Sequence, residues 1–267
     1  MKLSIVQSTE PASFSALAYK EDWAKNIGKL KYMGYDGIEL AVRDPKLLDT
    51  LLLKSLLQQH GLLVPAIGTG QAFGEDGLSL VHADPAIRRL AIERVKSHVR
   101  LAADLGALTI IGLVRGKRGS AIATGQAEQW LIEGLRECAA EAPAAKLGVE
   151  PINRYETDLI NTVNSALNLV EKIKLENVGL LLDTFHMNIE EPSILESVIS
   201  SKDRLFHVHV ADSNRWFPGA GHIDFKAIVD VLEQIGYSGF LSAEILPLPD
   251  PDSAATNTLA HFRKIAA

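Results

Sequence analysis

The chain has 267 residues, 47% of them hydrophobic, and a formal net charge of -6 at pH 7. No Pro/Gly/Ser-rich linker, charge block or low-complexity tract divides it, so we predict a single domain over residues 1–267. The acidic balance, without a basic stripe, argues against nucleic acid as a ligand. The single cysteine, Cys138, excludes an internal disulfide. No apolar run reaches the length of a secretory signal or a membrane span, so we expect a soluble, cytoplasmic protein.

Short runs of valine, isoleucine and leucine alternate with longer amphipathic stretches along the chain. This pattern is typical of a parallel sheet whose strands are joined by crossover helices. Two of the helices have clear boundaries: Asp84-Pro85 begins one that Gly106 ends, and Asp224 begins another that Gly236 ends. We predict eight strands, at residues 3–6, 37–41, 63–67, 107–113, 147–150, 179–183, 205–210 and 240–244.

These repeated units predict an α/β fold, specifically a (β/α)8 TIM barrel. The alternative is an open doubly wound sheet, which usually carries a glycine-rich turn after its first strand. No such turn follows residues 3–6. Eight strands in a chain of this length favour closure, because barrels of this kind typically need about 250 residues.

Four acidic or imidazole side chains stand at the carboxyl ends of the last four predicted strands: Glu150, Asp183, His209 and Glu244. In a (β/α)8 barrel these ends form the catalytic face, where side chains from successive strands converge. One carboxylate after a strand is weak evidence, because it is often a helix cap. Four such groups on successive strands predict a divalent metal site. Oxygen ligands with one nitrogen and no thiolate favour Mn²⁺, with Mg²⁺ or Co²⁺ possible and zinc as second choice.

Further polar groups follow the same strands. His186 lies three residues after the aspartate, Arg215 six after the histidine, and Glu156 six after the first glutamate. Their positions in loops at the catalytic face suit substrate binding. His207 lies two residues before His209 and therefore points to the same side of the strand, either as a partner of the metal ligand or as a filler of the barrel interior.

Three segments carry a family resemblance. The chain reads Glu-Pro-Ile-Asn-Arg-Tyr-Glu at 150–156, Asp-Thr-Phe-His-Met-Asn-Ile-Glu-Glu at 183–191, and His-Val-His at 207–209, followed by Asn-Arg at 214–215 and Pro-Gly at 218–219. These segments resemble the D-tagatose and D-allulose 3-epimerases of the xylose-isomerase-like barrel superfamily. The resemblance is strong over the second half of the chain. It implies a homo-oligomer, a dimer or a tetramer.

The resemblance also implies roles for the residues already singled out. Glu150 and Glu244 would be both metal ligands and the acid/base pair, and Asp183 and His209 would complete the metal shell. The residues that would bind substrate oxygens are Glu156, His186 and Arg215.

The chemistry is consistent with the residues themselves. To epimerise a carbon next to a ketone, an enzyme must remove its proton and return one to the other face, which requires two acid/base groups. Glu150 and Glu244 follow strands that are three apart in the predicted barrel, so they can flank a substrate. A divalent metal would stabilise negative charge that develops on the substrate oxygens of an enediolate. No organic cofactor is needed.

The loop after the fourth predicted strand, residues 112–119, bears on the substrate. It is basic where the best-known ketohexose epimerases have an aromatic loop, and Arg115 is the residue nearest the strand end. Together with Gly-Thr-Gly-Gln-Ala at 68–72, it makes this half similar to the 5-keto-L-gluconate epimerases. We therefore favour a keto-sugar acid (5-keto-L-gluconate or D-tagaturonate) over ketohexoses of the D-tagatose and D-fructose type, with Arg115 contacting the substrate carboxylate.

Three alternatives remain open. An aldose-ketose isomerase, such as a hydroxypyruvate isomerase, would use the same enediolate chemistry on a terminal carbon. An abasic-site endonuclease shares the superfamily but needs more metal ligands and a positive surface. A non-catalytic sugar-acid-binding protein could keep the metal pocket, although binding alone does not require two glutamates.

Overall fold

The strands form a closed parallel barrel. The computed structural model describes residues 1–120 and 122–265, and each strand pairs with the next in chain order until β8 returns to β1. The predicted TIM barrel is therefore confirmed. The strands are β1 (Lys2–Ser8), β2 (Gly37–Ala41), β3 (Ala66–Gly68), β4 (Leu108–Ile111), β5 (Lys146–Val149), β6 (Val178–Asp183), β7 (Leu205–Val210) and β8 (Phe240–Ala243).

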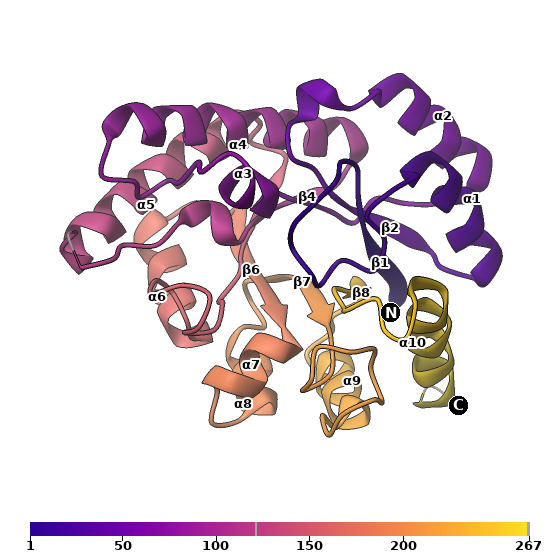
Figure 1. Cartoon of the computed structure of the whole chain (residues 1–267). Helices are drawn as coiled ribbons and strands as arrows, with labels where there is room; N and C mark the ends of the chain where they lie inside the picture. The colour runs from indigo at the N-terminus through magenta and orange to yellow at the C-terminus, as the bar shows by residue number, and fades with distance from the viewer. Residues whose placement is uncertain (121, 266–267) are drawn as a thin grey trace.

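Helices surround the strands (Figure 1). They are α1 (Trp23–Met33), α2 (Thr50–His60), α3 (Gly70–Gly74), α4 (Pro85–Leu105), α5 (Thr124–Ala140), α6 (Val163–Ile173), α7 (Thr184–Glu190), α8 (Ile194–Ser200), α9 (Phe225–Gln234) and α10 (Pro251–Ile265). The predicted boundaries of α4 and α9 are confirmed. The Asp84 carboxylate accepts from the N–H of Ala86, and the Asp224 carboxylate accepts from that of Ala227. Gly106, with φ 66°, caps the end of α4.

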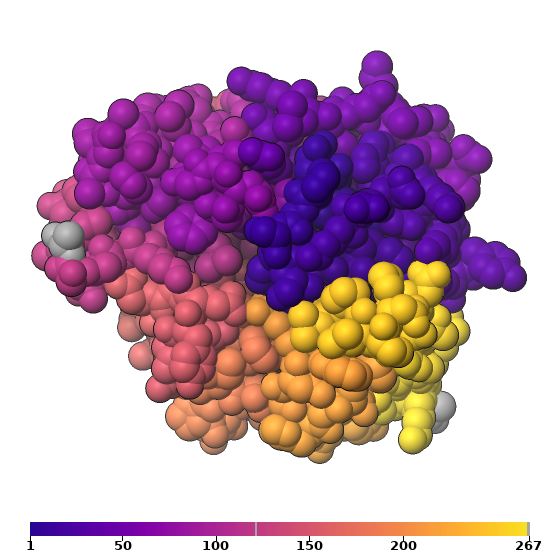
Figure 2. All heavy atoms as spheres, viewed as in Figure 1, coloured from indigo at the N-terminus to yellow at the C-terminus, as the bar shows by residue number. Residues whose placement is uncertain are grey.

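The two ends of the chain meet at the barrel seam. Figure 2 shows the indigo atoms of the first residues beside the yellow atoms of the last helix. The Tyr19 hydroxyl donates to Asp252 over 2.8 Å, and the Tyr35 hydroxyl donates to the carbonyl of Ala255 over 2.9 Å. These contacts tie α10 to the segments on either side of α1, so the last helix closes over the seam between β8 and β1.

The third and fourth strands differ from their predicted ranges. β3 begins at Ala66, because Leu63 makes only an isolated bridge to Gly37. β4 ends at Ile111, and a short 3₁₀ helix, η2 (Leu113–Arg115), follows it. Residues predicted to continue the strand therefore turn back towards the barrel wall, and this decides where Arg115 points.

The barrel interior has an apolar layer below the catalytic face. Side chains of β3, β4 and β6 pack there, namely Ala66, Leu108, Ile110 and Leu181, with the partly buried Phe206 of β7. Because β4 and β6 are not neighbours, these side chains meet across the interior. A larger core lies between the strands and the helices. Together the two layers hold the strand ends, and the polar groups on them, in fixed positions.

Candidate active site

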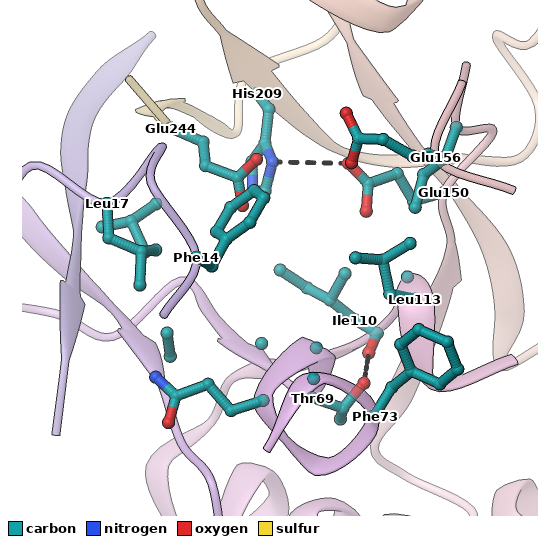
Figure 3. Close-up of a pocket in the computed structure, with 18 of the residues that line it drawn as sticks. Phe14, Leu17, Thr69, Phe73, Ile110, Leu113, Glu150, Glu156, His209 and Glu244 are labelled. Atoms are coloured by element: carbon teal, nitrogen blue, oxygen red, sulfur yellow. Dashed lines mark hydrogen bonds and ion pairs between the residues drawn. The ribbon is translucent and has the colours of Figure 1, made fainter. Parts of the chain in front are cut away.

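The four predicted metal ligands lie together. Glu150 follows β5, Asp183 ends β6, His209 lies in β7 and Glu244 follows β8, and Asp183 and His209 are directly paired in register. One potential ligand atom from each of the four lies within 4.8 Å of those of the others. Figure 3 shows Glu150, His209 and Glu244 at one end of a cavity.

Three atoms of this cluster are buried without a hydrogen-bond partner: Glu150 Oε1, Asp183 Oδ2 and His209 Nδ1. His209 Nδ1 lies 3.8 Å from each of the other two. The second oxygen of Asp183, by contrast, accepts from the N–H of Phe185 over 2.7 Å. Buried polar atoms without partners are costly, and three that lie this close together suit a shared positive partner. The donor set therefore fits a divalent cation with oxygen ligands and one nitrogen.

The electrostatics of the cluster support the same conclusion. Burial, followed by repulsion from Glu244, raises the pKa of Glu150 well above its usual range. Burial likewise raises the pKa of Glu244 to about 7. Burial alone would lower the pKa of His209, but attraction to Glu39 and a hydrogen bond with it raise this pKa well above the usual value. A bound cation would offset the repulsion among these carboxylates.

Arg215 links the metal cluster to the predicted substrate residues. Its Nη1 donates to Glu156 Oε1 over 2.8 Å, and its Nη2 donates to Glu244 Oε2 over 3.0 Å. The guanidinium carbon lies 5.0 Å from the ring centre of Phe14 and 4.7 Å from that of Phe185. The backbone of Arg215 is left-handed, with φ 61°, a conformation that non-glycine residues adopt mainly where surrounding structure imposes it.

His186 is a neutral donor at the same end of the cavity. Burial lowers its pKa to about 4. Asn153 Nδ2 lies 2.8 Å from His186 Nδ1 and 3.0 Å from Glu156 Oε1, so the amide donates to both. The imidazole proton must therefore be on Nε2, which lies 3.8 Å from Glu150 Oε1. His186 thus presents an N–H to a ligand beside Glu150.

The cavity has a volume of about 370 Å³. Glu150, Glu156, His186, His209, Arg215 and Glu244 line one side of it. The rest of the lining is mainly apolar, with Phe14 and Leu17 from the segment after β1, Phe73 from α3, Ile110 from β4 and Leu113 from η2, and Figure 3 shows Phe14 beside Glu244 and His209. The polar end and the apolar wall form one continuous pocket, of the kind that binds small molecules.

Arg115 is not where the sequence predicts it, and this prediction is corrected. The side chain is fully buried and is not part of the cavity lining. Its guanidinium donates to five backbone carbonyls, those of Ile111, Gly112, Glu150, Leu159 and Ile160. The η2 turn directs the side chain into the wall between β4 and β5, so Arg115 has no path to a substrate carboxylate.

Glu39 and Asp212 belong to the site although the sequence reasoning missed them. Glu39, in β2, binds His207 and His209 at 2.8 Å each. This settles the role of His207, which is a partner of Glu39. The Asp212 carboxylate accepts from the N–H groups of Ser213, Gly219 and Ile223 and so organises the loop that carries Arg215. The one available signal for Glu39 is a single charge within the apolar run 37–41.

A sequence model of the family described as xylose isomerase-like TIM barrel matches residues 27–265. The chain belongs to this family. Within it, the L-ribulose 3-epimerase of Methylomonas sp. (strain DH-1) is 32% identical over 267 aligned residues, covering 94% of this chain and 89% of the relative. The ketose 3-epimerase of Arthrobacter globiformis is 31% identical, covering 80% of this chain and 74% of the relative.

A solved structure of a sugar epimerase has the same fold as this chain. The D-allulose 3-epimerase from Methylomonas sp., solved with D-allulose, superposes with a TM-score of 0.83 and 27% identity, covering 98% of this chain and 97% of that one. The predicted resemblance to sugar epimerases is therefore confirmed. So is the enzyme class, an isomerase of the ketose 3-epimerase type. Among the described helices, none combines the length and apolar character needed to cross a membrane.

Proposed function

We propose that the protein is a metal-dependent ketose 3-epimerase that inverts the carbon next to the ketone by proton transfer through Glu150 and Glu244. The observation that carries this proposal is the pair itself. Two buried carboxylates with raised pKa values come from β5 and β8 and line one cavity, with the imidazole of His209 beside them. Binding alone does not require two such groups, whereas epimerisation does.

Each glutamate has a distinct environment that suits proton transfer. Glu150 Oε1 is free of protein donors, and the raised pKa makes this carboxyl competent to hold a proton. Glu244 is oriented by Arg215, which binds its Oε2. One of the two removes the C3 proton of the ketose, and the other delivers a proton to the opposite face of the enediolate. A divalent metal held by Glu150, Asp183, His209 and Glu244 would supply Lewis-acid stabilisation of the substrate oxygens.

The remaining polar groups would hold the sugar in place. His186 offers its Nε2–H beside Glu150, where a substrate oxygen can accept it. Glu156 can accept from a sugar hydroxyl while it retains its contact with Arg215. The apolar wall of Phe14, Phe73 and Leu113 would cover the carbon skeleton and exclude water from the reacting carbon.

The charges around the cavity favour a neutral sugar as substrate. Five glutamates line the cavity, and among the described lining residues Arg215 is the one lysine or arginine. Its two terminal nitrogens already bind Glu156 and Glu244. Because Arg115 is turned away, the residue that supported a carboxylate-bearing substrate no longer does so. We therefore propose a neutral ketose, such as L-ribulose or D-allulose, ahead of 5-keto-L-gluconate and D-tagaturonate.

Three further features stay proposals. Mn²⁺ is the expected metal, because the oxygen-rich donor set with one nitrogen suits it. A dimer or tetramer is expected from the family resemblance, and the exposed Tyr155 and Leu51 are the side chains to examine at an interface. A cytoplasmic location follows from the sequence expectations alone.

Proton NMR in D₂O tests the function. The Mn²⁺-loaded protein should incorporate deuterium at C3 of a ketose and yield the C3 epimer. Neither Glu150→Gln nor Glu244→Gln should do so, whereas the variant Glu171→Gln, at an exposed position of α6, should behave as the unmodified protein. The panel should include D-allulose, L-ribulose, 5-keto-L-gluconate, D-tagaturonate and hydroxypyruvate.

The same experiment separates the alternatives. Deuterium at C1 together with aldose formation would indicate an aldose-ketose isomerase. Sugar binding without exchange at any carbon across the panel would indicate a non-catalytic binding protein. Faster turnover of the keto-acids than of every neutral ketose would restore the sugar-acid hypothesis.

A further inference from the structure

Glu39 reaches across the barrel interior to two histidines of β7. Its Oε1 lies 2.8 Å from His209 Nε2, and its Oε2 lies 2.8 Å from His207 Nε2. The exposed fractions of Glu39, His207 and His209 are 1%, 2% and 1%. β2 and β7 are not neighbours in the barrel, so this bond spans the interior directly below the metal cluster.

The contact determines which nitrogen of His209 carries the ring proton. An ionised carboxylate can only accept hydrogen bonds, so each histidine must present an N–H from Nε2. In the neutral His209 ring, Nδ1 then has a free lone pair. This atom is the one with no partner, 3.8 Å from both Glu150 Oε1 and Asp183 Oδ2. A metal ion can bind only an imidazole nitrogen that carries a lone pair.

His207 fixes the carboxylate itself. It occupies the second oxygen of Glu39, so the carboxylate cannot rotate away from His209 without losing a buried hydrogen bond. The two imidazole rings lie edge to face, with centres 5.5 Å apart and planes at 80°. Glu39 is therefore held by one histidine while it orients the other.

We propose that Glu39 is a positioning residue for the metal: it holds His209 as the Nε2–H tautomer and aims Nδ1 at the site formed with Glu150, Asp183 and Glu244. The inference rests on the metal site of the proposed function and not on the identity of the sugar. Carboxylate partners of this kind typically change metal affinity roughly 10–100-fold when they are removed.

Calorimetric titration of Mn²⁺ into metal-free protein tests the proposal. Glu39→Leu removes the acceptor and should raise the Kd for Mn²⁺ roughly 10–100-fold. Glu39→Gln keeps one oxygen that can accept from His209, so its Kd should lie between those of Glu39→Leu and the unmodified protein. His207→Gln keeps an N–H donor to Glu39, so it should raise the Kd less than Glu39→Leu does, and Glu171→Leu, at an exposed position of α6, is the matched control that should leave the Kd unchanged. A purely structural role would lower the urea midpoint of these variants without altering Mn²⁺ affinity.

¹⁵N NMR of the imidazoles gives a readout independent of any variant's folding. In the metal-free unmodified protein, at a pH high enough for the His209 ring to be neutral, its single ring proton should be on Nε2. A neutral ring that carries its proton on Nδ1 would overturn the proposal, as would a folded Glu39→Leu variant whose Kd lies within twofold of the unmodified value. Absence of Mn²⁺ binding by the unmodified protein would instead overturn the metal site on which both proposals depend. Binding with the predicted order of affinities supports the role of Glu39 even if no ketose in the panel is turned over.

Discussion

Arg115 donates a hydrogen bond of 2.5 Å from Nη1 to the backbone carbonyl of Glu150. A buried cation therefore supports the main chain of a residue that we assign to proton transfer. Burial lowers the pKa of Arg115 to about 10, which still leaves it charged at neutral pH. Its partners are carbonyls of the turn after β4 and of the segment after β5, so it joins two loops of the catalytic face.

Replacing Arg115 should damage the fold and the activity together. Arg115→Met leaves several buried carbonyls without donors, and we expect a loss of about 3 kcal/mol or more in the free energy of unfolding. The value of kcat/KM should fall by similar factors for neutral ketoses and keto-acids. Urea unfolding and steady-state kinetics check this, with Lys117→Ala in the exposed part of the same loop as control. A rise in KM confined to the keto-acids would contradict the buried role.

Gly112 leaves the space that Glu150 occupies. A Cβ added at residue 112 would lie 2.7 Å from Glu150 Oε2, closer than real contacts allow. Gly112→Ala should displace the carboxylate and lower kcat by roughly 100-fold, because small misplacements of reacting groups cost about this much. Gly125→Ala provides the control, since a Cβ there meets nothing within 4 Å. Unchanged kcat in Gly112→Ala would argue against Glu150 as a proton-transfer group.

Asp212 should make part of the stability depend on acid pH. Burial raises its pKa, but backbone N–H groups of Ser213, Gly221, Ile223 and Gly219 outweigh this and leave the pKa below its usual value. A lowered folded-state pKa stabilises the protein above the unfolded value of about 3.9, and this contribution is lost as the pH falls through the folded value.

The corresponding variant is Asp212→Asn. At pH 7 it should be less stable by about 1–3 kcal/mol, because charged hydrogen bonds to the loop are weakened. The difference from the unmodified protein should shrink as the pH falls below about 4. Urea unfolding at a series of pH values measures it, and a difference that stays constant down to pH 3 would refute the assignment.

Metal binding should release protons. The pKa of Glu150 is raised well above the usual range by burial and then by Glu244, so in the metal-free protein this carboxyl keeps a proton to higher pH than an ordinary glutamate does. A cation needs the ionised ligand and displaces that proton. Titration of Mn²⁺ in PIPES and in Tris, buffers with different ionisation enthalpies, should give different observed heats, and the difference should be smaller in Glu150→Gln. Equal heats in both buffers would show that no proton is released.

The sequence predicted the barrel and the clustering of the four candidate metal ligands because both depend on regular features. Apolar runs alternate with helices, and the ends of successive strands must meet at one face, so Glu150, Asp183, His209 and Glu244 could be brought together without coordinates. The same reasoning found Glu156, His186 and Arg215, which follow these strands, although His186 lies in α7 and not in a loop as the sequence suggested.

Two residues show where this reasoning failed. Arg115 lies near a strand end, but the η2 turn reverses the chain there, and proximity in sequence gives no direction for a side chain after a turn. Glu39 acts across the interior on a strand that is not its neighbour, and no spacing in a linear sequence records that contact. Both errors concern the orientation of side chains, whereas the order of the strands was correct.

The pairing of β8 with β1 has a consequence for how the proposed metal centre would assemble. β8 is held on both sides, by β7 and by the first strand of the chain, and Glu244 follows directly after it. A nascent chain that has not yet produced β8 offers three of the four ligands and an open barrel wall. The four proposed ligands can therefore meet only after β8 has joined the barrel. A protein that binds the metal tightly must then have a closed barrel.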